Sequence, residues 1–211
     1  MLQAALGFRA HSGWAALVAV SLERGQPSVL CRKRVQLVET FNYDFRQPYH
    51  TAKKMPLQDG REFISTVKLQ ASRLAAAALR ELQVEIKPAG CRLVAVALLL
   101  ASGRPLPALE DILASHALIH TADGELFREA LAEACARCGM RLCRVKEKNL
   151  VDEAVCCFKV REAALLKRVA ELGRPLGSPW SQDEKFAALA AWLALSQSVR
   201  GKSAKRKTRL A

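Results

Sequence analysis

The fold is decided by residues 1–38, which read MLQAALGFRAHSGWAALVAVSLERGQPSVLCRKRVQLV. Apolar and polar residues alternate at the start of this stretch, and a polar break follows at 11–13. An almost wholly apolar run covers 14–22, and a third run covers 29–38 beyond a second polar break. Runs of this length between polar, Gly-containing breaks are typical of strands joined by tight turns. The stretch therefore predicts a meander of three antiparallel strands.

Farther along the chain, helical patterns alternate with two further strands. Residues 62–83 place apolar side chains three and four positions apart, which predicts an amphipathic helix. Residues 93–101 are apolar on both faces, as a strand covered by helices is, and 140–146 reads as a short strand. Further helices are expected at 108–115, after Thr121 up to residue 138, over 152–172 and from 182 onward. The predicted fold is α/β, a mixed five-stranded sheet with helices on both faces.

The chain is expected to form one domain over residues 1–199, followed by a basic, disordered tail at 200–211. With 211 residues, 51% of them hydrophobic, it is long and apolar enough to bury a core. No apolar run reaches the roughly 18 residues that a membrane span needs, and no signal peptide is recognisable. We therefore expect a cytoplasmic protein without a membrane partner, and its oligomeric state stays open.

The net charge of +13 indicates the class of partner. The tail contributes a dense group of cations without an acid. They include Lys202, Lys205, Arg206, Lys207 and Arg209. A basic body with a basic tail suits a polyanion such as DNA or RNA, between which the sequence does not distinguish. The alternatives are solubility, or charge that faces an acidic protein.

Residues 39–60 show no clear period and are predicted to form a long irregular loop. The stretch is rich in aromatic and basic residues, among them Tyr49, His50, Lys53 and Lys54. Aromatic rings beside cations suit base stacking and phosphate contact. The alternative is that the rings anchor the loop on the core.

Seven cysteines are scattered along the chain, and an odd number fits reduced thiols better than a disulfide framework. Cys135 and Cys138 have the spacing of half a zinc site, with Cys143 and Cys156 or Cys157 as further ligands. The first two also fall on the apolar stripe of a predicted helix, where cysteine packs as a small hydrophobe. We therefore predict neither a metal nor a cofactor.

The order of elements resembles the ribonuclease H-like fold and, within it, the RuvC-like Holliday-junction resolvases. In that family the first strand ends in a Gly-Ile-Asp-Pro-Gly type turn, and a Gly-Trp-Ala-Val type strand follows. The matching stretch here is 6–17, Leu-Gly-Phe-Arg-Ala-His-Ser-Gly-Trp-Ala-Ala-Leu. The family's late helix, an aspartate followed by an alanine-rich run, is matched by 183–195. The helix, glycine and short strand of 127–145 agree in kind.

The departures from this family concern its metal site. Nucleases of this group use several carboxylates to hold two divalent metals, which clamp the reacting oxygens of a phosphodiester. This chain has Arg9 in place of the first-strand aspartate, and only the apolar run 94–100 in place of a glutamate on the central strand. Asp183 alone stays in place. The resemblance therefore implies that the two-metal site is absent and that the cationic Arg9 suits a phosphate group instead.

The densest group of candidate catalytic or metal-binding residues consists of His116, His120, Asp123 and Glu125. The two histidines are four positions apart, which places them on one face of a helix. Two histidines with a carboxylate suit a transition metal, and histidine also acts as an acid or base near neutral pH.

Helix capping is the alternative explanation for these acids. Thr121 reads as an N-cap, and acids in the first turn behind it complement the helix dipole. Ser181 and Glu184 likewise have the form of a capping box around Asp183.

The first functional hypothesis is a nucleic-acid-binding protein of ribonuclease H-like fold that does not cut its ligand. Besides the tail, the residues expected to contact nucleic acid are Arg9, His11, Tyr49, His50, Lys53 and Lys54.

Two alternatives leave open whether the chain is an enzyme. One is a metal-dependent nuclease or hydrolase with a site rebuilt from His116, His120, Glu125 and Asp183, which requires these side chains to converge. The other is a protein-interaction subunit whose basic surface meets an acidic partner.

Overall fold

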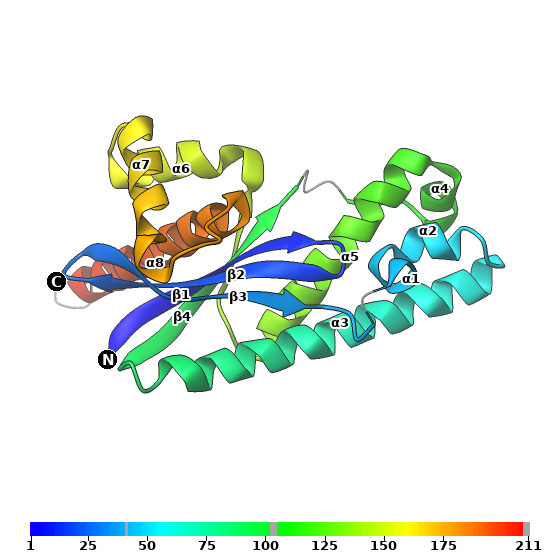
Figure 1. The fold of residues 1–211 in the computed structure, drawn as a ribbon, viewed down its shortest axis with the longest axis horizontal. Helices are drawn as coiled ribbons and strands as arrows, with labels where there is room; N and C mark the ends of the chain where they lie inside the picture. Colours follow the sequence, from blue (N-terminus) through cyan, green and yellow to red (C-terminus); the bar gives the residue numbers. More distant parts are fainter. Residues whose placement is uncertain (41, 102–104, 209–211) are drawn as a thin grey trace.

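The computed structural model describes the backbone of residues 1–40, 42–101 and 105–208, and side chains up to Ser198 within those ranges. A mixed sheet lies at the centre, with helices on both faces (Figure 1). The strands are ordered β3-β2-β1-β4-β5 in a five-stranded sheet. Their bounds are β1 Leu2–His11, β2 Trp14–Glu23, β3 Gln26–Gln36, β4 Cys91–Leu100 and β5 Leu142–Lys146. The predicted α/β fold is confirmed.

The first three strands pair antiparallel, as the meander pattern predicts. β4 lies parallel to β1, and β5 lies parallel to β4. The carboxyl ends of β1, β4 and β5 therefore meet at one edge of the sheet, so the side chains that follow these strands lie close together.

Helices α3 and α5 cover one face of the sheet, and α8 covers the other, with α6 and α7 packed outside it (Figure 1). The helices are α1 Tyr43–Arg46, α2 Pro48–Ala52, α3 Leu57–Ile86, α4 Leu109–Ala114, α5 His116–Arg137, α6 Leu150–Phe158, α7 Glu162–Leu172 and α8 Gln182–Thr208, with short 3-10 helices η1 Glu147–Asn149 and η2 Arg174–Leu176. Within the described ranges, no helix combines the length and the apolar character needed to cross a membrane.

Alternation along β1 and β2 divides their side chains between two cores. Leu6, Phe8 and Leu17 pack on the side of α3 and α5. Ala5 and Val18 pack on the side of α8. Successive side chains of a strand point to opposite faces, so a strand that is covered on both faces is apolar throughout.

The contact between α8 and β1 is so close that only glycine fits at position 7. A Cβ atom on Gly7 would lie 1.8 Å from the carbonyl oxygen of Ala187 and 3.0 Å from the amide nitrogen of Ala191. The alanine-rich sequence of α8 supplies a matching small surface, and both of these alanines are fully buried. This contact fixes the position of α8 on the sheet.

Residues 39–60 are not the irregular loop that the sequence predicts. They contain α1, α2 and the start of α3, which begins at Leu57. The Asn42 side chain accepts the Phe45 amide at 3.1 Å, and Pro48 occupies the first turn of α2. Both features start helices. Helices of four and five residues are too short to show an apolar period, which explains the error.

Other helix boundaries also differ from the prediction. α5 begins before Thr121, because the Ser115 side chain caps it by accepting the Leu118 amide at 3.5 Å. The stretch 152–172 is divided into α6 and α7 at Lys159, whose φ of 56° is left-handed. α8 continues to Thr208, whereas the sequence predicts a disordered tail from residue 200. The side chains from residue 199 onward lie outside the described part. Their role in binding nucleic acid stays a prediction.

Gly7→Ala is expected to lower the free energy of unfolding by about 1–3 kcal/mol, because the added methyl group must push the backbone of α8 away. Guanidinium denaturation followed by circular dichroism measures this loss. The control is Gly25→Asn, since no atom lies within 4 Å of the Cβ position at Gly25 and asparagine tolerates its φ of +80°. A Gly7→Ala protein as stable as the control would show that α8 does not approach β1 this closely.

Candidate functional site

The Arg9 guanidinium is bound by two carboxylates at the carboxyl end of β1. Its Nε donates to Oε2 of Glu147 at 3.0 Å, and its Nη2 donates to Oε1 of the same residue at 2.6 Å. Its Nη1 donates to Oδ1 of Asp183. A bidentate pair of this kind fixes the geometry of all three side chains. Arg9 thus binds carboxylates, not the open phosphate position that the sequence suggests.

Three elements that are far apart in the sequence bring these groups together. Arg9 lies near the end of β1, Glu147 directly follows β5, and Asp183 lies in the first turn of α8. The predicted capping box starts that helix and is confirmed. The Ser181 hydroxyl accepts the Asp183 amide at 3.2 Å, and the Glu184 carboxylate accepts the Ser181 amide at 2.8 Å.

A stack of cationic and aromatic side chains continues from this site across the sheet. Nε2 of His11 lies 2.9 Å from Oδ1 of Asp183. The His11 ring stacks on Trp14, with centroids 4.3 Å apart and 13° between the planes. The Arg34 guanidinium lies 4.0 Å from the centre of the Trp14 ring, a cation–π distance. β1, β2 and β3 thus each contribute a side chain to this stack, and His11 joins the stack to Asp183.

The surrounding charges set the protonation of the ion pair. Burial alone would raise the pKa of Asp183, but the hydrogen bonds and charges of Arg9 and His11 outweigh burial and hold that pKa below its ordinary value. The Glu147 carboxylate, together with Asp183, raises the pKa of Arg9 despite desolvation. The carboxylate of Asp183 and the guanidinium of Arg9 are therefore both charged at neutral pH.

A cleft of about 610 Å³ opens over these groups. Its lining includes Arg9, His11, Arg128, Glu147 and Lys148. Lys148 is exposed, whereas Arg128 is half buried and pairs with a glutamate of its own helix. Arg9 and Arg128 are thus already paired with carboxylates, and Lys148 is the lining cation best placed to meet an anionic ligand.

A second group of titratable side chains lies between α2 and the start of α5. Asp123 is 3% exposed; its Oδ1 accepts the Tyr49 amide at 2.8 Å, and its Oδ2 lies 2.5 Å from Nδ1 of His50. The Nε2 atoms of His116 and His120 lie 3.0 Å apart, and both rings contact His50. Burial raises the pKa of Asp123, although the hydrogen bonds from His50 and the Tyr49 amide oppose this rise.

The four residues considered for a rebuilt hydrolase site do not gather in one place. His116 and His120 face each other, as their spacing predicts. Glu125 pairs with an arginine of its own helix at 3.1 Å, and Asp183 belongs to the Arg9 group. In the described part of the chain, no hydrogen bond or ion pair joins the two histidines to Asp183.

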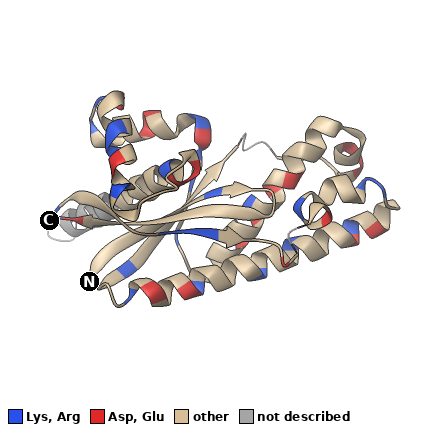
Figure 2. Cartoon of the chain, in the orientation of Figure 1, with Lys and Arg blue, Asp and Glu red and all other residues tan. Residues whose placement is uncertain are grey.

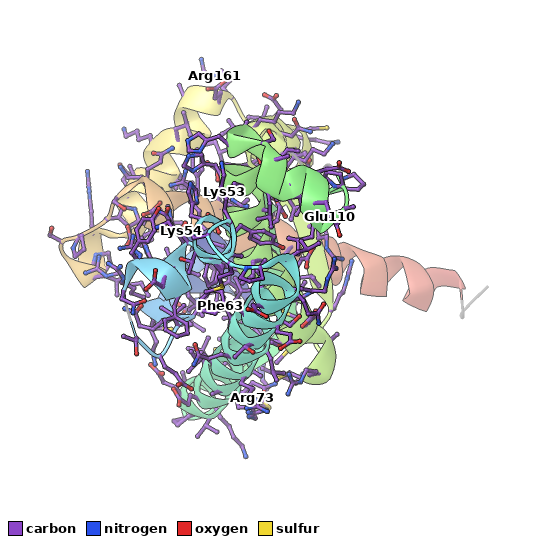
Figure 3. The ribbon with its side chains drawn as sticks, turned by 90° about the vertical axis from the view of Figure 1, so that its right-hand side faces the viewer. Lys53, Lys54, Phe63, Arg73, Glu110 and Arg161 are labelled. Carbon is purple, nitrogen blue, oxygen red and sulfur yellow. The ribbon has the colours of Figure 1, made fainter. Side chains whose placement is uncertain are left out.

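The residues in and directly after α2 that are predicted to contact nucleic acid have different environments. Lys53 and Lys54 are exposed at the α2 end of the molecule (Figure 3), and Nζ of Lys54 lies 5.8 Å from the centre of the Tyr43 ring. Tyr49 and His50 are half buried and bound to Asp123 instead of pointing outward as expected. This is the anchoring role that the sequence leaves open for the rings of this stretch.

The tail residues predicted to contact nucleic acid, Lys202, Lys205, Arg206, Lys207 and Arg209, lie outside the described side chains.

Sequence reasoning missed Glu147, Trp14 and Arg34 as site residues. Glu147 could have been found, because it directly follows a strand that pairs parallel, and such positions meet at the carboxyl edge of a sheet. Trp14 and Arg34 approach each other only through the pairing of β2 with β3, whose register the sequence does not reveal.

The cysteines do not form the zinc site considered above. Cys135 is buried, and burial raises the pKa of its thiol to about 12. Among the residues that the structure describes, the only group of three or more potential metal ligands consists of His50, His116 and His120. Cys135 therefore packs as a small hydrophobe.

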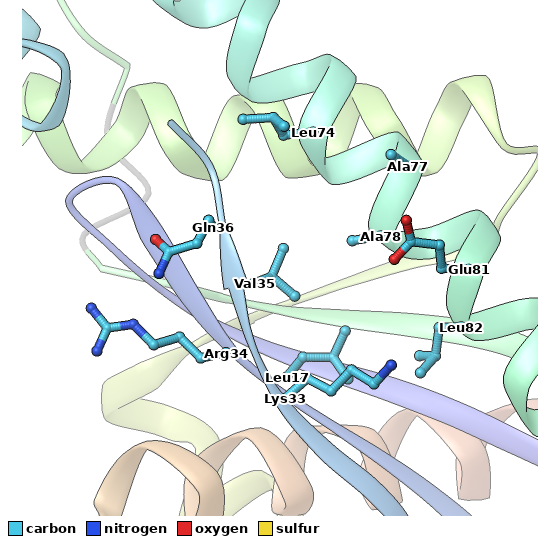
Figure 4. Close-up of a pocket in the computed structure, with 10 residues that line it drawn as sticks. All are labelled: Leu17, Lys33, Arg34, Val35, Gln36, Leu74, Ala77, Ala78, Glu81 and Leu82. Carbon is cyan, nitrogen blue, oxygen red and sulfur yellow. The ribbon is translucent and has the colours of Figure 1, made fainter. Parts of the chain in front are cut away.

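A smaller hollow of about 240 Å³ lies between β3 and α3 (Figure 4). Its lining combines aliphatic side chains, among them Leu17, Val35 and Leu82, with the charged side chains of Lys33, Arg34 and Glu81. The Arg9 cleft is the larger of the two and is therefore the better candidate.

Comparison with solved structures supports the fold. The Thermus thermophilus RuvC structure matches with a TM-score of 0.52 and 13% identity over 94% of this chain and 96% of that chain. T. thermophilus RuvC in complex with Holliday junction substrate matches with a TM-score of 0.55 and 12% identity over the same shares of both chains. No protein-family model and no curated protein matches the sequence. At this identity the likeness shows the ribonuclease H-like fold alone, and function has to be argued from the site.

Arg9→Gln is expected to lower the free energy of unfolding by about 1.5–3 kcal/mol at neutral pH, because two carboxylates lose their shared cation. The lowered pKa of Asp183 contributes stability above the unfolded aspartate pKa of about 3.9, and this is lost as pH falls through the lower folded value. The difference between variant and wild type should therefore shrink in acid, which urea denaturation at several pH values measures.

The control for this variant is Arg61→Gln, which removes an exposed ion pair with Glu110. A pair of this kind contributes about 0–1 kcal/mol. If the two variants lost the same amount of unfolding free energy at every pH, the role assigned to Arg9 would be contradicted.

Proposed function

We propose that the protein binds nucleic acid at the cleft beside Arg9 and does not cut it by a two-metal mechanism. The observation that supports this most directly is the binding of Arg9 to both Glu147 and Asp183. Asp183 is the one carboxylate that the resemblance retains, and Glu147 is a second carboxylate at the same edge of the sheet. The guanidinium, a permanent cation, takes the place of a metal between them.

The contacts of the carboxylates argue against two-metal hydrolysis. Two divalent ions about 3.5–4 Å apart need available carboxylate oxygens around them. Both oxygens of Glu147 accept bonds from Arg9, and Oδ1 of Asp183 contacts Arg9 and His11. A magnesium ion would have to displace a guanidinium or bind beside its positive charge. The resemblance to the resolvases predicts an aspartate at the position of Arg9. The arginine therefore removes one metal ligand and adds a positive charge that repels a metal ion.

The charge of the chain supports a polyanionic ligand. The net charge is +13, and Figure 2 shows Lys and Arg on the sheet as well as on the helices. Arg128 and Lys148 line the cleft. Cations that neutralise phosphates release counterions, which drives binding of nucleic acid. RuvC, which has a similar fold, is solved in complex with Holliday junction substrate, so this fold accommodates nucleic acid in that protein.

Two further surfaces extend the proposed interface. The stack of His11, Trp14 and Arg34 presents an exposed guanidinium, on which a nucleic-acid base can stack. Lys53 and Lys54, directly after α2, offer phosphate contacts in this proposal. In this proposal the basic tail adds affinity that does not depend on base sequence.

Lys148→Ala is expected to weaken binding several-fold and to reduce the slope of log K against log salt concentration by about 1, because one phosphate contact is lost. Fluorescence anisotropy with a labelled four-way DNA junction, a single-stranded DNA and an RNA, each over a salt series, measures both quantities. The three ligands also separate DNA from RNA binding.

Lys87→Ala is the matched control for Lys148→Ala. Lys87 is exposed just beyond α3, beside the amino end of β1 and hence at the opposite end of that strand from the cleft (Figure 1). Equal losses from the two variants, or binding of the wild type that does not change with salt, would contradict the cleft as the binding site. Failure to bind any of the three nucleic acids, with co-purification of an acidic protein, would favour the protein-interaction alternative.

Incubation with Mg²⁺ or Mn²⁺ is expected to leave the junction and the single strands intact, in the wild type and in Asp183→Asn alike. The reason is that Arg9 already neutralises the carboxylates that the ions would need. Denaturing gels measure cleavage. Products that the wild type makes and Asp183→Asn does not would overturn the non-catalytic part of the proposal and leave the binding part standing.

A further inference from the structure

Three histidines from two helices converge beside α2. His50 belongs to α2, and His116 and His120 belong to the start of α5. One ligand nitrogen of each ring lies within 4.8 Å of the other two, and the Nε2 atoms of His116 and His120 are 3.0 Å apart. The three rings lie edge to face, with angles of 90°, 64° and 82° between their planes. A potential ligand nitrogen from each of the three rings therefore lies close to the other two.

Asp123 orients this cluster from the protein interior. Its Oδ2 lies 2.5 Å from Nδ1 of His50, so His50 presents its Nε2 as the available ligand. A carboxylate that bonds the second nitrogen of a metal-binding histidine fixes its tautomer and its ring orientation. Among the described residues, the polar partners of this buried carboxylate are an imidazole and the Tyr49 amide. Its negative charge is therefore available to balance an external cation.

We propose that His50, His116 and His120 bind one zinc ion, with Asp123 as the residue that orients His50. Imidazole nitrogen suits zinc, whereas magnesium and calcium prefer oxygen ligands. Zinc–nitrogen bonds of about 2.0–2.1 Å in tetrahedral geometry separate two ligand nitrogens by about 3.4 Å. The 3.0 Å separation of His116 and His120 needs only a small opening to reach that value.

The fourth coordination position would open to solvent, because His116 and His120 are exposed. Zinc with three protein ligands binds water or another small ligand at the open position. The Tyr43 ring lies 6.3 Å from the His50 ring, and Lys54 lies over Tyr43. An anionic oxygen that approaches the ion from this side would meet a cation. This site does not depend on the proposed binding of nucleic acid at the Arg9 cleft.

Zinc binding is tested with tag-free protein that has been stripped by a chelator. Isothermal titration with ZnCl₂ is expected to show one zinc per chain, and zinc is expected to raise the melting temperature. Cobalt(II) in place of zinc is expected to give the visible absorption bands of a four-coordinate site. Absence of these bands, with no binding in the titration, would show that the two histidines only share a hydrogen bond and would overturn the proposal.

Variants assign the ligands. His116→Ala and His120→Ala change exposed side chains, so the fold should be retained, as circular dichroism checks, while the cobalt bands are lost. Asp123→Asn is expected to weaken zinc binding about 10–100-fold, as the loss of an orienting partner does. His11→Gln removes a histidine outside the cluster and is expected to keep the stoichiometry and the bands. Equal zinc affinity in the wild type and in the double variant His116→Ala/His120→Ala would rule the site out.

Discussion

The ion pair of Arg9 with Glu147 and Asp183 is the constraint on which this edge of the sheet depends. A guanidinium at the end of a buried strand is tolerated because two carboxylates compensate for the water it loses. Its partners come from the segment after β5 and from the start of α8, so one interaction fixes three elements relative to one another. Loss of any one member leaves the others as poorly compensated charges. The three residues therefore act as a set.

The same ion pair restricts the chemistry of the site. A divalent ion and a guanidinium both neutralise carboxylates, but only the ion has coordination positions that can activate water. The sheet topology brings the carboxyl ends of β1, β4 and β5 together whatever side chains they carry. Position 9 is occupied here by a guanidinium that binds two carboxylates at this edge. In the function we propose, Lys148 of the neighbouring cleft contacts a phosphate without a metal.

The sequence predicts those parts of the fold that local patterns determine. The meander follows from its alternating runs and turns, the buried β4 from its two apolar faces, and the capping box at Ser181 from its spacing. Contacts between segments that lie far apart in the sequence are not indicated by any local pattern. His50 lies in a helix too short for a period, and nothing near it in the sequence indicates His116. The local capping signal at Thr121 gave the wrong helix start, because Ser115 caps the helix earlier in the chain.

The roles of Asp123 and Asp183 depend on the groups that each carboxylate contacts in the fold more than on the neighbouring residues in the sequence. Each reads in the sequence as an acid in the first turn of a helix, but only Asp183 occupies that position. Their pKa values move in opposite directions: burial raises that of Asp123, and Arg9 and His11 lower that of Asp183. Asp183 already has a permanent cation from its own chain, whereas Asp123 has an imidazole and a backbone amide. Asp183 is thus held by a cation of its own chain, and Asp123 is held by groups of which one, His50, is a ligand in our zinc proposal.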